Sequence, residues 1–201
     1  MIVLLVNTSI DPVTGGGTAT RTVQLARSIQ KDFEVECIIL TTDQGLDETS
    51  KQQYSELKTV ILPCLNDRFY IPYFSWAKLK ELVEKIDVIH LMSHWSIINA
   101  IVYLLARQLD KPYTFCPAGS LHIFGRSALL KNIYNLFIGK SLIKNASQCI
   151  AITNLEKKEF LGFNVQEELI SIVPNGVDEN EFFPNLEASK AFKNKFGLQQ
   201  V

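Results

Sequence analysis

The chain has 201 residues, of which 47% are hydrophobic and 20% are charged, and this composition excludes a disordered polypeptide. Its length is that of one large domain. The formal net charge is only -1, so the chain lacks the broad positive field that attracts nucleic acid, and we expect no nucleic-acid partner.

Three of the four cysteines lie in apolar runs typical of strands, and no two of them form a CxxC pair. The four are Cys37, Cys64, Cys116 and Cys149. We favour reduced thiols in the core over metal or disulfide roles, which favours a cytoplasmic location, and we predict no metal site. No basic leader or cleavage site of a signal peptide is visible at the start of the chain. The longest apolar stretch, residues 97–106, is shorter than the about 20 residues that span a bilayer.

Short apolar runs alternate with amphipathic segments along the chain. The runs suit strands buried on both faces of a parallel sheet, and the segments have the apolar spacing of helices. We expect strands at residues 2–7, 35–40, 60–62, 87–91, 112–116, 149–152 and 170–173. We expect helices at residues 18–29, 76–86, 97–109, 129–145 (one helix or two) and 155–161. This alternation predicts an α/β fold with a doubly wound, mostly parallel sheet, helices on both faces and ligands at the carboxyl ends of the strands.

Three consecutive glycines, Gly15, Gly16 and Gly17, lie between the first strand and the first helix. Glycines let a backbone approach a ligand closely, and free N–H groups at a helix start favour an anion such as a phosphate. Thr18 is expected to cap this helix. A flexible turn without a ligand is the alternative. The glycines follow the strand too late for a dinucleotide motif, and Thr20 replaces its last glycine, which disfavours a nicotinamide-dependent oxidoreductase.

Two further loops at the carboxyl edge carry histidines. The loop after the fourth strand contains His94 and Trp95, which we expect near a ligand, although Trp95 could equally cover the following helix. His90, at the end of that strand, is interpreted as a hydrogen-bonded core residue. The loop at residues 117–126 places His122 among small residues, and a histidine can act as a general base near neutral pH. For His122, catalysis and simple exposure both stay open.

Two segments are candidates for contact with the acceptor and with a membrane. Residues 66–74, NDRFYIPYF, are either a cover for the core or an aromatic lip that stacks on sugars. Residues 129–145 carry Lys131, Lys140 and Lys144 among apolar side chains. This segment is either a surface helix packed on the sheet or a basic amphipathic helix that lies on an anionic membrane. A peripheral contact with the inner face of the membrane would suit a lipid-linked acceptor.

The ordered set of these motifs resembles the N-terminal domain of glycosyltransferase family 4, a retaining family with the GT-B fold. Each motif alone is weak, but together they cover essentially the whole chain. The matching stretches are the strand–GGG–helix opening at 2–29, DVIHL at 87–91 followed by Trp95 and Ser96, residues 112–121, residues 146–153 with Glu156, and VPNGVD at 173–178 followed by FFP at 182–184. The last stretch is the most specific, because it is similar to the family's connection towards a second domain.

The resemblance implies a hexosyltransferase that moves a sugar from a nucleotide-sugar donor to a saccharide or lipid-linked acceptor, as in cell-surface polysaccharide synthesis, without a cofactor. It implies that residues 1–184 form the Rossmann-like, acceptor-side half and that residues 185–201 approach a second, donor-binding domain. Without that domain we expect no transfer, because the donor and the departing diphosphate are poorly held. We assign catalysis to His94 and His122, and donor-phosphate or acceptor binding to Gly15, Gly16, Gly17, Thr18, Arg21, Trp95, Ser120, Arg126 and Asn175.

The chain departs from the family pattern at two positions. Many relatives have a histidine or an arginine where Ala118 stands, and they often have a second histidine where Met92 stands. His94 or His122 would have to compensate for these losses. The alternative to a transferase half is a stand-alone, non-catalytic module that binds a nucleotide or a sugar by itself.

Overall fold

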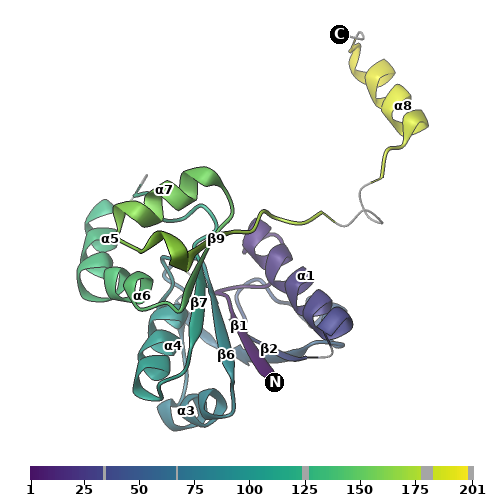
Figure 1. Cartoon of the computed structure of the whole chain (residues 1–201). Helices are drawn as coiled ribbons and strands as arrows, with labels where there is room; N and C mark the ends of the chain where they lie inside the picture. Colours follow the sequence, from purple (N-terminus) through teal and green to yellow (C-terminus); the bar gives the residue numbers. More distant parts are fainter. Residues whose placement is uncertain (34, 67, 124–126, 178–182, 199–201) are drawn as a thin grey trace.

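The computed structural model describes residues 1–33, 35–66, 68–123, 127–177 and 183–198 (Figure 1). Seven parallel strands form one sheet in the order β3–β2–β1–β6–β7–β8–β9. They are β1 (Ile2–Val6), β2 (Glu36–Thr42), β3 (Lys58–Leu62), β6 (Val88–Met92), β7 (Tyr113–Cys116), β8 (Gln148–Ala151) and β9 (Ile170–Ile172). The expected doubly wound, parallel sheet is therefore confirmed.

Helices cover both faces of this sheet. On one face lies α1 (Gly16–Phe33), and on the other lie α3 (Trp76–Glu84) and α4 (Ile97–Gln108). The remaining helical segments are α2 (Glu48–Gln53), α5 (Ala128–Tyr134), the π-helical turn η1 (Asn135–Gly139), α6 (Lys140–Lys144), α7 (Asn154–Gly162), the 3-10 turn η2 (Glu167–Leu169) and α8 (Leu186–Phe196). Because α5, η1 and α6 follow one another without a break, the segment predicted at 129–145 is one continuous helical run.

The central strand β1 is buried on both of its faces. Leu4 and Val6 belong to the apolar cluster with α3 and α4, whereas Val3 and Leu5 belong to the cluster with α1. Burying an aliphatic side chain of this size contributes about 1.5–3 kcal/mol. This two-sided burial is why a continuous apolar run, rather than an alternating one, specifies the strand.

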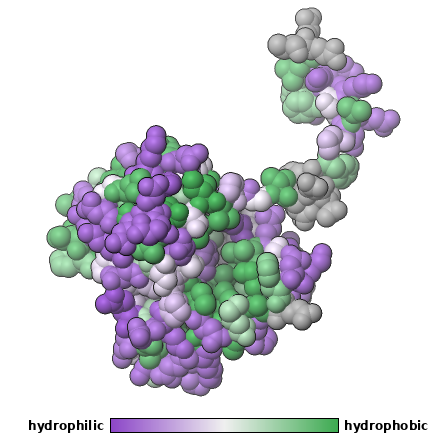
Figure 2. All heavy atoms as spheres, in the orientation of Figure 1, coloured by the Kyte–Doolittle hydropathy of each residue, from purple (hydrophilic) through white to green (hydrophobic). Residues whose placement is uncertain are grey.

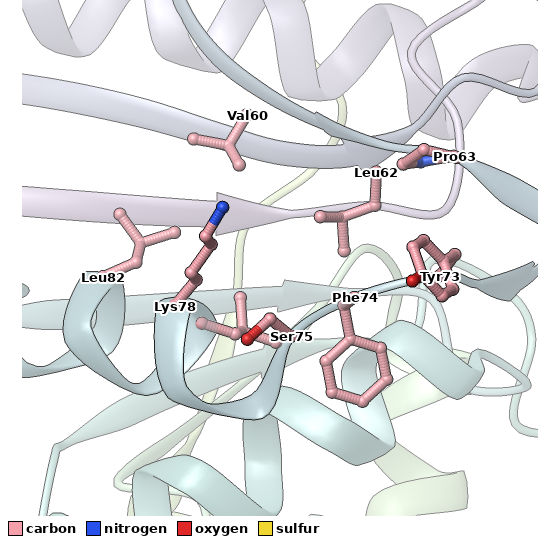
Figure 3. A pocket seen from close by; sticks show the side chains of 9 residues that line it. Val60, Leu62, Pro63, Tyr73, Phe74, Ser75, Lys78 and Leu82 are labelled. Carbon is pink, nitrogen blue, oxygen red and sulfur yellow. The ribbon is translucent and has the colours of Figure 1, made fainter.

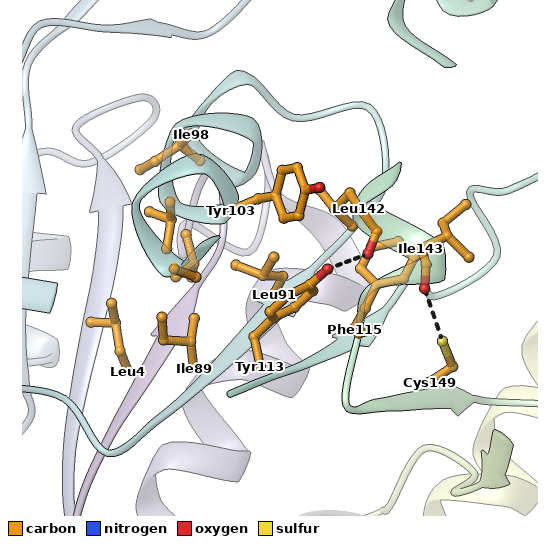
Figure 4. Close-up of a cluster of buried hydrophobic side chains, with 14 of the residues drawn as sticks. Leu4, Ile89, Leu91, Ile98, Tyr103, Tyr113, Phe115, Leu142, Ile143 and Cys149 are labelled. Carbon is orange, nitrogen blue, oxygen red and sulfur yellow. Dashed lines mark hydrogen bonds between the residues drawn. The ribbon is translucent and has the colours of Figure 1, made fainter. Parts of the chain in front are cut away.

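The larger cluster fills the space between the sheet, α4 and α6 (Figure 4). Its polar atoms are paired inside it: the Tyr113 hydroxyl donates a hydrogen bond to the carbonyl oxygen of Leu142 at 2.6 Å. Burial raises the pKa of Tyr113 well above its ordinary value, so the hydroxyl stays a donor. Cys149 lies in the same cluster as a free, buried thiol, and Cys37 and Cys116 are also free and buried, as expected.

Three short features differ from the sequence-based expectations. The helix α2 and the two-stranded hairpin of β4 (Cys64–Asn66) and β5 (Ile71–Pro72) were not predicted, because neither has enough residues for a clear apolar period. The expected cap at Thr18 is wrong: α1 begins earlier, at Gly16, and the Thr18 hydroxyl donates instead to the carbonyl oxygen of Gly15 at 2.8 Å.

The helix α8 lies apart from the sheet in Figure 1 and has no buried residue. Its start is capped by Asn185, whose side-chain oxygen accepts a hydrogen bond from Ala188 N at 2.9 Å. Gly197, in the left-handed conformation, follows its last turn. The assignment of residues 185–201 to a connection towards a second domain stays a prediction. Within the part of the chain that the structure describes, no helix combines the length and apolarity needed to cross a bilayer.

Candidate functional site: the carboxyl edge of the sheet

The loops at the carboxyl ends of the strands are hydrogen-bonded to one another. The strand order changes direction between β1 and β6, and in such sheets ligands bind in the crevice at this switch point. Across it, a hydrogen bond of 2.9 Å joins Thr8 Oγ1 and Ser96 Oγ. The next loop joins the same edge, because the Ser120 hydroxyl oxygen accepts from His94 N at 2.9 Å. The glycine-rich loop and the start of the 117–126 loop therefore lie on one rim, as predicted.

The glycine-rich loop combines a tight interior with an open surface. At Gly15 a Cβ atom would lie 2.6 Å from Ser9 O and 2.7 Å from Ala19 Cβ, so only glycine fits without a shift. Gly16 has a left-handed φ of 57°, and a Cβ at Gly16 or Gly17 would meet no atom within 4 Å. The first N–H groups of a helix have no partner within it. The start of α1 can therefore receive an anion.

Arg21, in the second turn of α1, ties this helix to the segment that follows β9. Its guanidinium donates to the side-chain oxygen of Asn175 and, at 3.3 Å, to the carbonyl oxygen of Val173. A shallow cleft of about 330 Å³ lies here, lined in part by Gly17, Arg21 and Asn175. Three of the residues assigned to binding from the sequence thus share one cleft, which places a cation beside an open helix start.

Glu156 links the loops that follow β7 and β8, a role that the sequence analysis missed. The side chain is 2% exposed. Its Oε1 accepts from Gly119 N at 2.5 Å, and its Oε2 accepts from Ile152 N at 2.7 Å. Thr153 caps α7 by accepting from Glu156 N at 3.2 Å. The Thr-x-x-Glu spacing of a capping box was the signal that could have revealed this residue.

His94, predicted to be catalytic, lies in the interior. The ring has no exposed surface and packs against Trp95, Phe115 and Tyr134. Its Nε2 is hydrogen-bonded to Asn135 Oδ1 at 2.8 Å. Burial lowers the pKa of His94 to about 4, opposed by that hydrogen bond. The ring reaches no ligand in this arrangement because it is enclosed, and a catalytic role for His94 stays an untested prediction.

Trp95 forms part of the enclosure around the His94 ring. Its ring is half-buried and lies edge-on to Tyr134 with centroids 5.7 Å apart. The Lys131 ammonium lies 5.3 Å from the centre of the Trp95 ring, within the range of a cation–π contact. These contacts hold Trp95 against α5, which neither interpretation from the sequence included. A ligand contact by Trp95 and a cover over the following helix α4 both stay predictions.

His122, the other predicted catalytic residue, is exposed. It lines an open cavity of about 380 Å³ together with Leu121, Glu159 and Phe163, so it lies against α7. Burial raises the pKa of Glu159, the Glu156 carboxylate adds to this, and the charge of His122 opposes it. Arg126, predicted to bind, lies outside the described residues.

His90 is a core residue, as interpreted from the sequence. It is 9% exposed, and its Nδ1 is hydrogen-bonded to Thr114 Oγ1 on the neighbouring strand at 2.6 Å. Burial, with a smaller contribution from the nearby Arg21 charge, lowers its pKa to about 4. Its imidazole is therefore neutral at physiological pH.

The aromatic segment at 66–74 lies at the far end of the same edge, after β3. Figure 3 shows Tyr73 and Phe74 beside an apolar cavity of about 650 Å³ that also includes Leu62 and Lys78. Phe74 packs against the larger core cluster, whereas Tyr73 is 64% exposed. One side of the segment therefore covers the core, and the other exposes aromatic surface to solvent. A lip that stacks on sugars stays a prediction.

The fold and this edge define a class, the Rossmann-like half of a GT-B fold with a candidate anion site at its carboxyl edge. A family profile described as Glycosyltransferase Family 4 matches residues 15–181. The chain belongs to this family. No curated protein sequence matches the chain.

Several solved structures share the fold at low sequence identity. A complex of the Anabaena protein Alr3699/HepE with UDP-glucose has a TM-score of 0.69 at 16% identity, over 98% of this chain and 50% of that one. The lipopolysaccharide outer core galactosyltransferase WaaB has 0.61 at 15% identity, over 89% and 46%. A UDP-GlcNAc 2-epimerase from Neisseria meningitidis has 0.61 at 17% identity, over 100% and 54%. The chain thus spans about half the length of these relatives, and the likeness concerns the fold alone.

Proposed function

We propose that the chain is the acceptor-side half of a retaining hexosyltransferase, which moves a sugar from a nucleotide-sugar to a saccharide or lipid-linked acceptor. The observation that carries the proposal is the cleft shared by Gly17, Arg21 and Asn175 at the open start of α1. A diphosphate suits this cleft, because helix N–H groups and a guanidinium both donate to phosphate oxygens. HepE, which has the same fold, was solved with UDP-glucose, and this supports the ligand class.

The acceptor is proposed to bind between this cleft and the aromatic segment at 66–74. Tyr73 and Phe69 are exposed there, and flat aromatic surfaces suit sugar rings. His122 is kept as the proposed catalytic group, because its ring is accessible whereas that of His94 is enclosed. The sugar and the base of the donor are proposed to bind to a second domain, so residues 1–201 alone should transfer no sugar.

The donor site can be tested on the chain itself by following backbone amide signals in NMR during titration with UDP-glucose and with pyrophosphate. We expect the signals of Gly16, Gly17 and Arg21 to shift, with a dissociation constant on the order of 1 mM, because one wall of a cleft holds a donor weakly. Arg21→Ala should weaken both titrations about tenfold. Arg27→Ala removes another α1 cation, which is paired with Glu56, and should leave them unchanged.

Two outcomes would contradict the proposal. Sugar transfer by residues 1–201 alone would mean that the chain is not half of an enzyme. Micromolar binding of a nucleotide or a free sugar by the chain alone, with no effect of Arg21→Ala, would favour the stand-alone binding module instead.

A further inference from the structure

The helical run α5–η1–α6 presents an apolar face to solvent. Along the first two segments, large apolar side chains recur every three or four residues and are strongly exposed, with Leu129 at 73%, Leu136 at 71% and Phe137 at 75%. Leu130 and Ile133 extend the same face. Hydrophobic side chains are visible at the left margin of Figure 2, over the region that Figure 1 labels α5. Apolar surface gathered in this way marks an interaction site.

The opposite side of this run is already packed. Asn135 and Gly139 of η1 are buried, and Asn135 Oδ1 is hydrogen-bonded to His94 Nε2 at 2.8 Å. In α6, Ser141 Oγ is hydrogen-bonded to Tyr103 OH at 2.6 Å. The run is therefore held on the body by one face. Its other face carries the exposed apolar side chains, which are not packed against the described part of the core.

The stretch of sequence that contains this run carries charge of one sign. Between Asp110 and Glu156 the sequence has no acidic residue and five basic ones. The basic residues are Lys111, Arg126, Lys131, Lys140 and Lys144. Since the whole chain has a formal charge of -1, the rest of it carries -1 minus 5, or -6. Lys140 and Lys144 are exposed, and they continue the line of Ile133 and Phe137 along the run.

We infer that the face made of Leu129, Leu130, Ile133, Leu136, Phe137, Lys140 and Lys144 docks on an anionic lipid bilayer. Apolar side chains at the interface together with lysines at the headgroups are the combination that holds an interfacial helix on a membrane. A symmetric contact with the same face of a second copy is disfavoured, because its lysines would oppose these lysines across the contact.

Docking through this face would also bring the candidate site towards the lipid. The run starts at Ala128, directly after the loop that leaves the carboxyl end of β7. That loop carries Ser120 and His122, so the rim adjoins the docked helix. A lipid-linked acceptor could then reach the rim without leaving the bilayer. The membrane contact itself does not depend on the proposed sugar transfer, and binding to vesicles tests it alone.

The test is flotation of residues 1–201 with vesicles of phosphatidylcholine, with or without about 30% phosphatidylglycerol. We expect flotation with the anionic vesicles, little with the neutral ones, and release at about 1 M salt, where charges are screened within ~3 Å. Phe137→Ser and the pair Lys140→Glu with Lys144→Glu should each reduce partition by at least about tenfold. These side chains are exposed, so circular dichroism and melting should match the unmodified chain.

The matched control lies on α8, which is also basic and has exposed aromatic residues. Lys193→Glu with Lys195→Glu makes the same charge change there and should leave flotation unchanged. Loss of flotation in the α8 pair alone would overturn the inference, as would failure of the unmodified chain to float. A dimer in gel filtration that Phe137→Ser dissociates, or binding to soluble polyglutamate in place of vesicles, would identify a protein partner and equally overturn it.

Discussion

The carboxylate of Glu156 accepts a hydrogen bond from the backbone N–H of Gly119 at a distance of 2.5 Å. The same carboxylate accepts from Ile152 N at 2.7 Å, so one buried side chain holds the ends of two neighbouring strands. Gly119 has a left-handed φ of 84° and Ala118 one of 50°. This strained turn carries Ser120 at the rim of the candidate site, and Glu156 is the side chain that fixes it.

Replacing Glu156 should therefore loosen the turn and weaken the fold. Glu156→Ala leaves two N–H groups without their acceptor, and we expect a loss of about 2–4 kcal/mol in the free energy of unfolding, measured by urea denaturation. Glu156→Gln keeps one acceptor oxygen and should lose about half as much. Glu159→Gln, on the same helix, is the control and should change stability little, because its carboxylate accepts no backbone hydrogen bond from the described residues. Equal stability of all three variants would contradict a role for Glu156 in holding the turn.

Gly15 and Gly17 should respond differently to alanine. Gly15→Ala would press a methyl group against Ser9 O and the Ala19 side chain, and overpacking of this kind costs about 1–3 kcal/mol. Gly17→Ala meets open space within α1 and should raise stability slightly, by about 0.4–1 kcal/mol, rather than lower it. Gly17→Ala is therefore the variant that separates ligand binding from folding, because a methyl group there would obstruct a diphosphate alone. A large loss of stability in Gly17→Ala would show that the loop is packed more tightly than the structure indicates.

The parallel sheet could be predicted because its strands are specified locally. β1 is a continuous apolar run, and this pattern needs no knowledge of its partners. The glycine-rich loop was recognised for the same reason. By contrast, the pairing of Arg21 with Asn175 joins residues 154 positions apart, and no local pattern encodes it.

The enclosure of His94 shows where sequence reasoning failed to place a side chain. Its position in a loop after a strand, beside Trp95, is the same for a ligand-facing and for a buried histidine. The burial of His94 depends on η1, where Asn135 supplies the hydrogen bond and Gly139 lets the helix approach the ring closely. A π-helical turn of this kind has no reliable sequence signature, and its partner lies 41 residues away.

Asn99 should be among the polar residues most sensitive to substitution. It is fully buried in α4, and its side-chain amide donates to the carbonyl oxygens of Met92 at 2.6 Å and Ser93 at 2.8 Å. Asn99→Leu leaves both carbonyls unpaired, and we expect a loss of about 2–4 kcal/mol in urea denaturation. Asn132→Leu on exposed α5 is the matched control and should be nearly neutral. If both variants unfold at the same urea concentration, the two carbonyl bonds contribute nothing.

Protonation of His94 and His90 should make the fold sensitive to mild acid. Burial holds the pKa of each at about 4, whereas an unfolded chain has the ordinary value of about 6.5. As the pH falls below 6.5, the unfolded state therefore binds protons first, and stability is lost until about pH 4. One such histidine contributes a slope of about 1.4 kcal/mol per pH unit. His94→Gln retains an N–H donor for Asn135 but does not titrate.

Between pH 7 and pH 4 the unmodified chain should thus lose about 3 kcal/mol more than His94→Gln, as measured by urea denaturation at a series of pH values. Asn132→Gln on the exposed face of α5 is the control, because neither side chain titrates and the profile should stay parallel to that of the unmodified chain. His94→Gln is expected to be less stable at pH 7, since a buried ring is replaced by a smaller side chain, and the comparison therefore rests on the slopes. Parallel slopes for the unmodified chain and His94→Gln would mean that His94 is accessible to protons in the folded state.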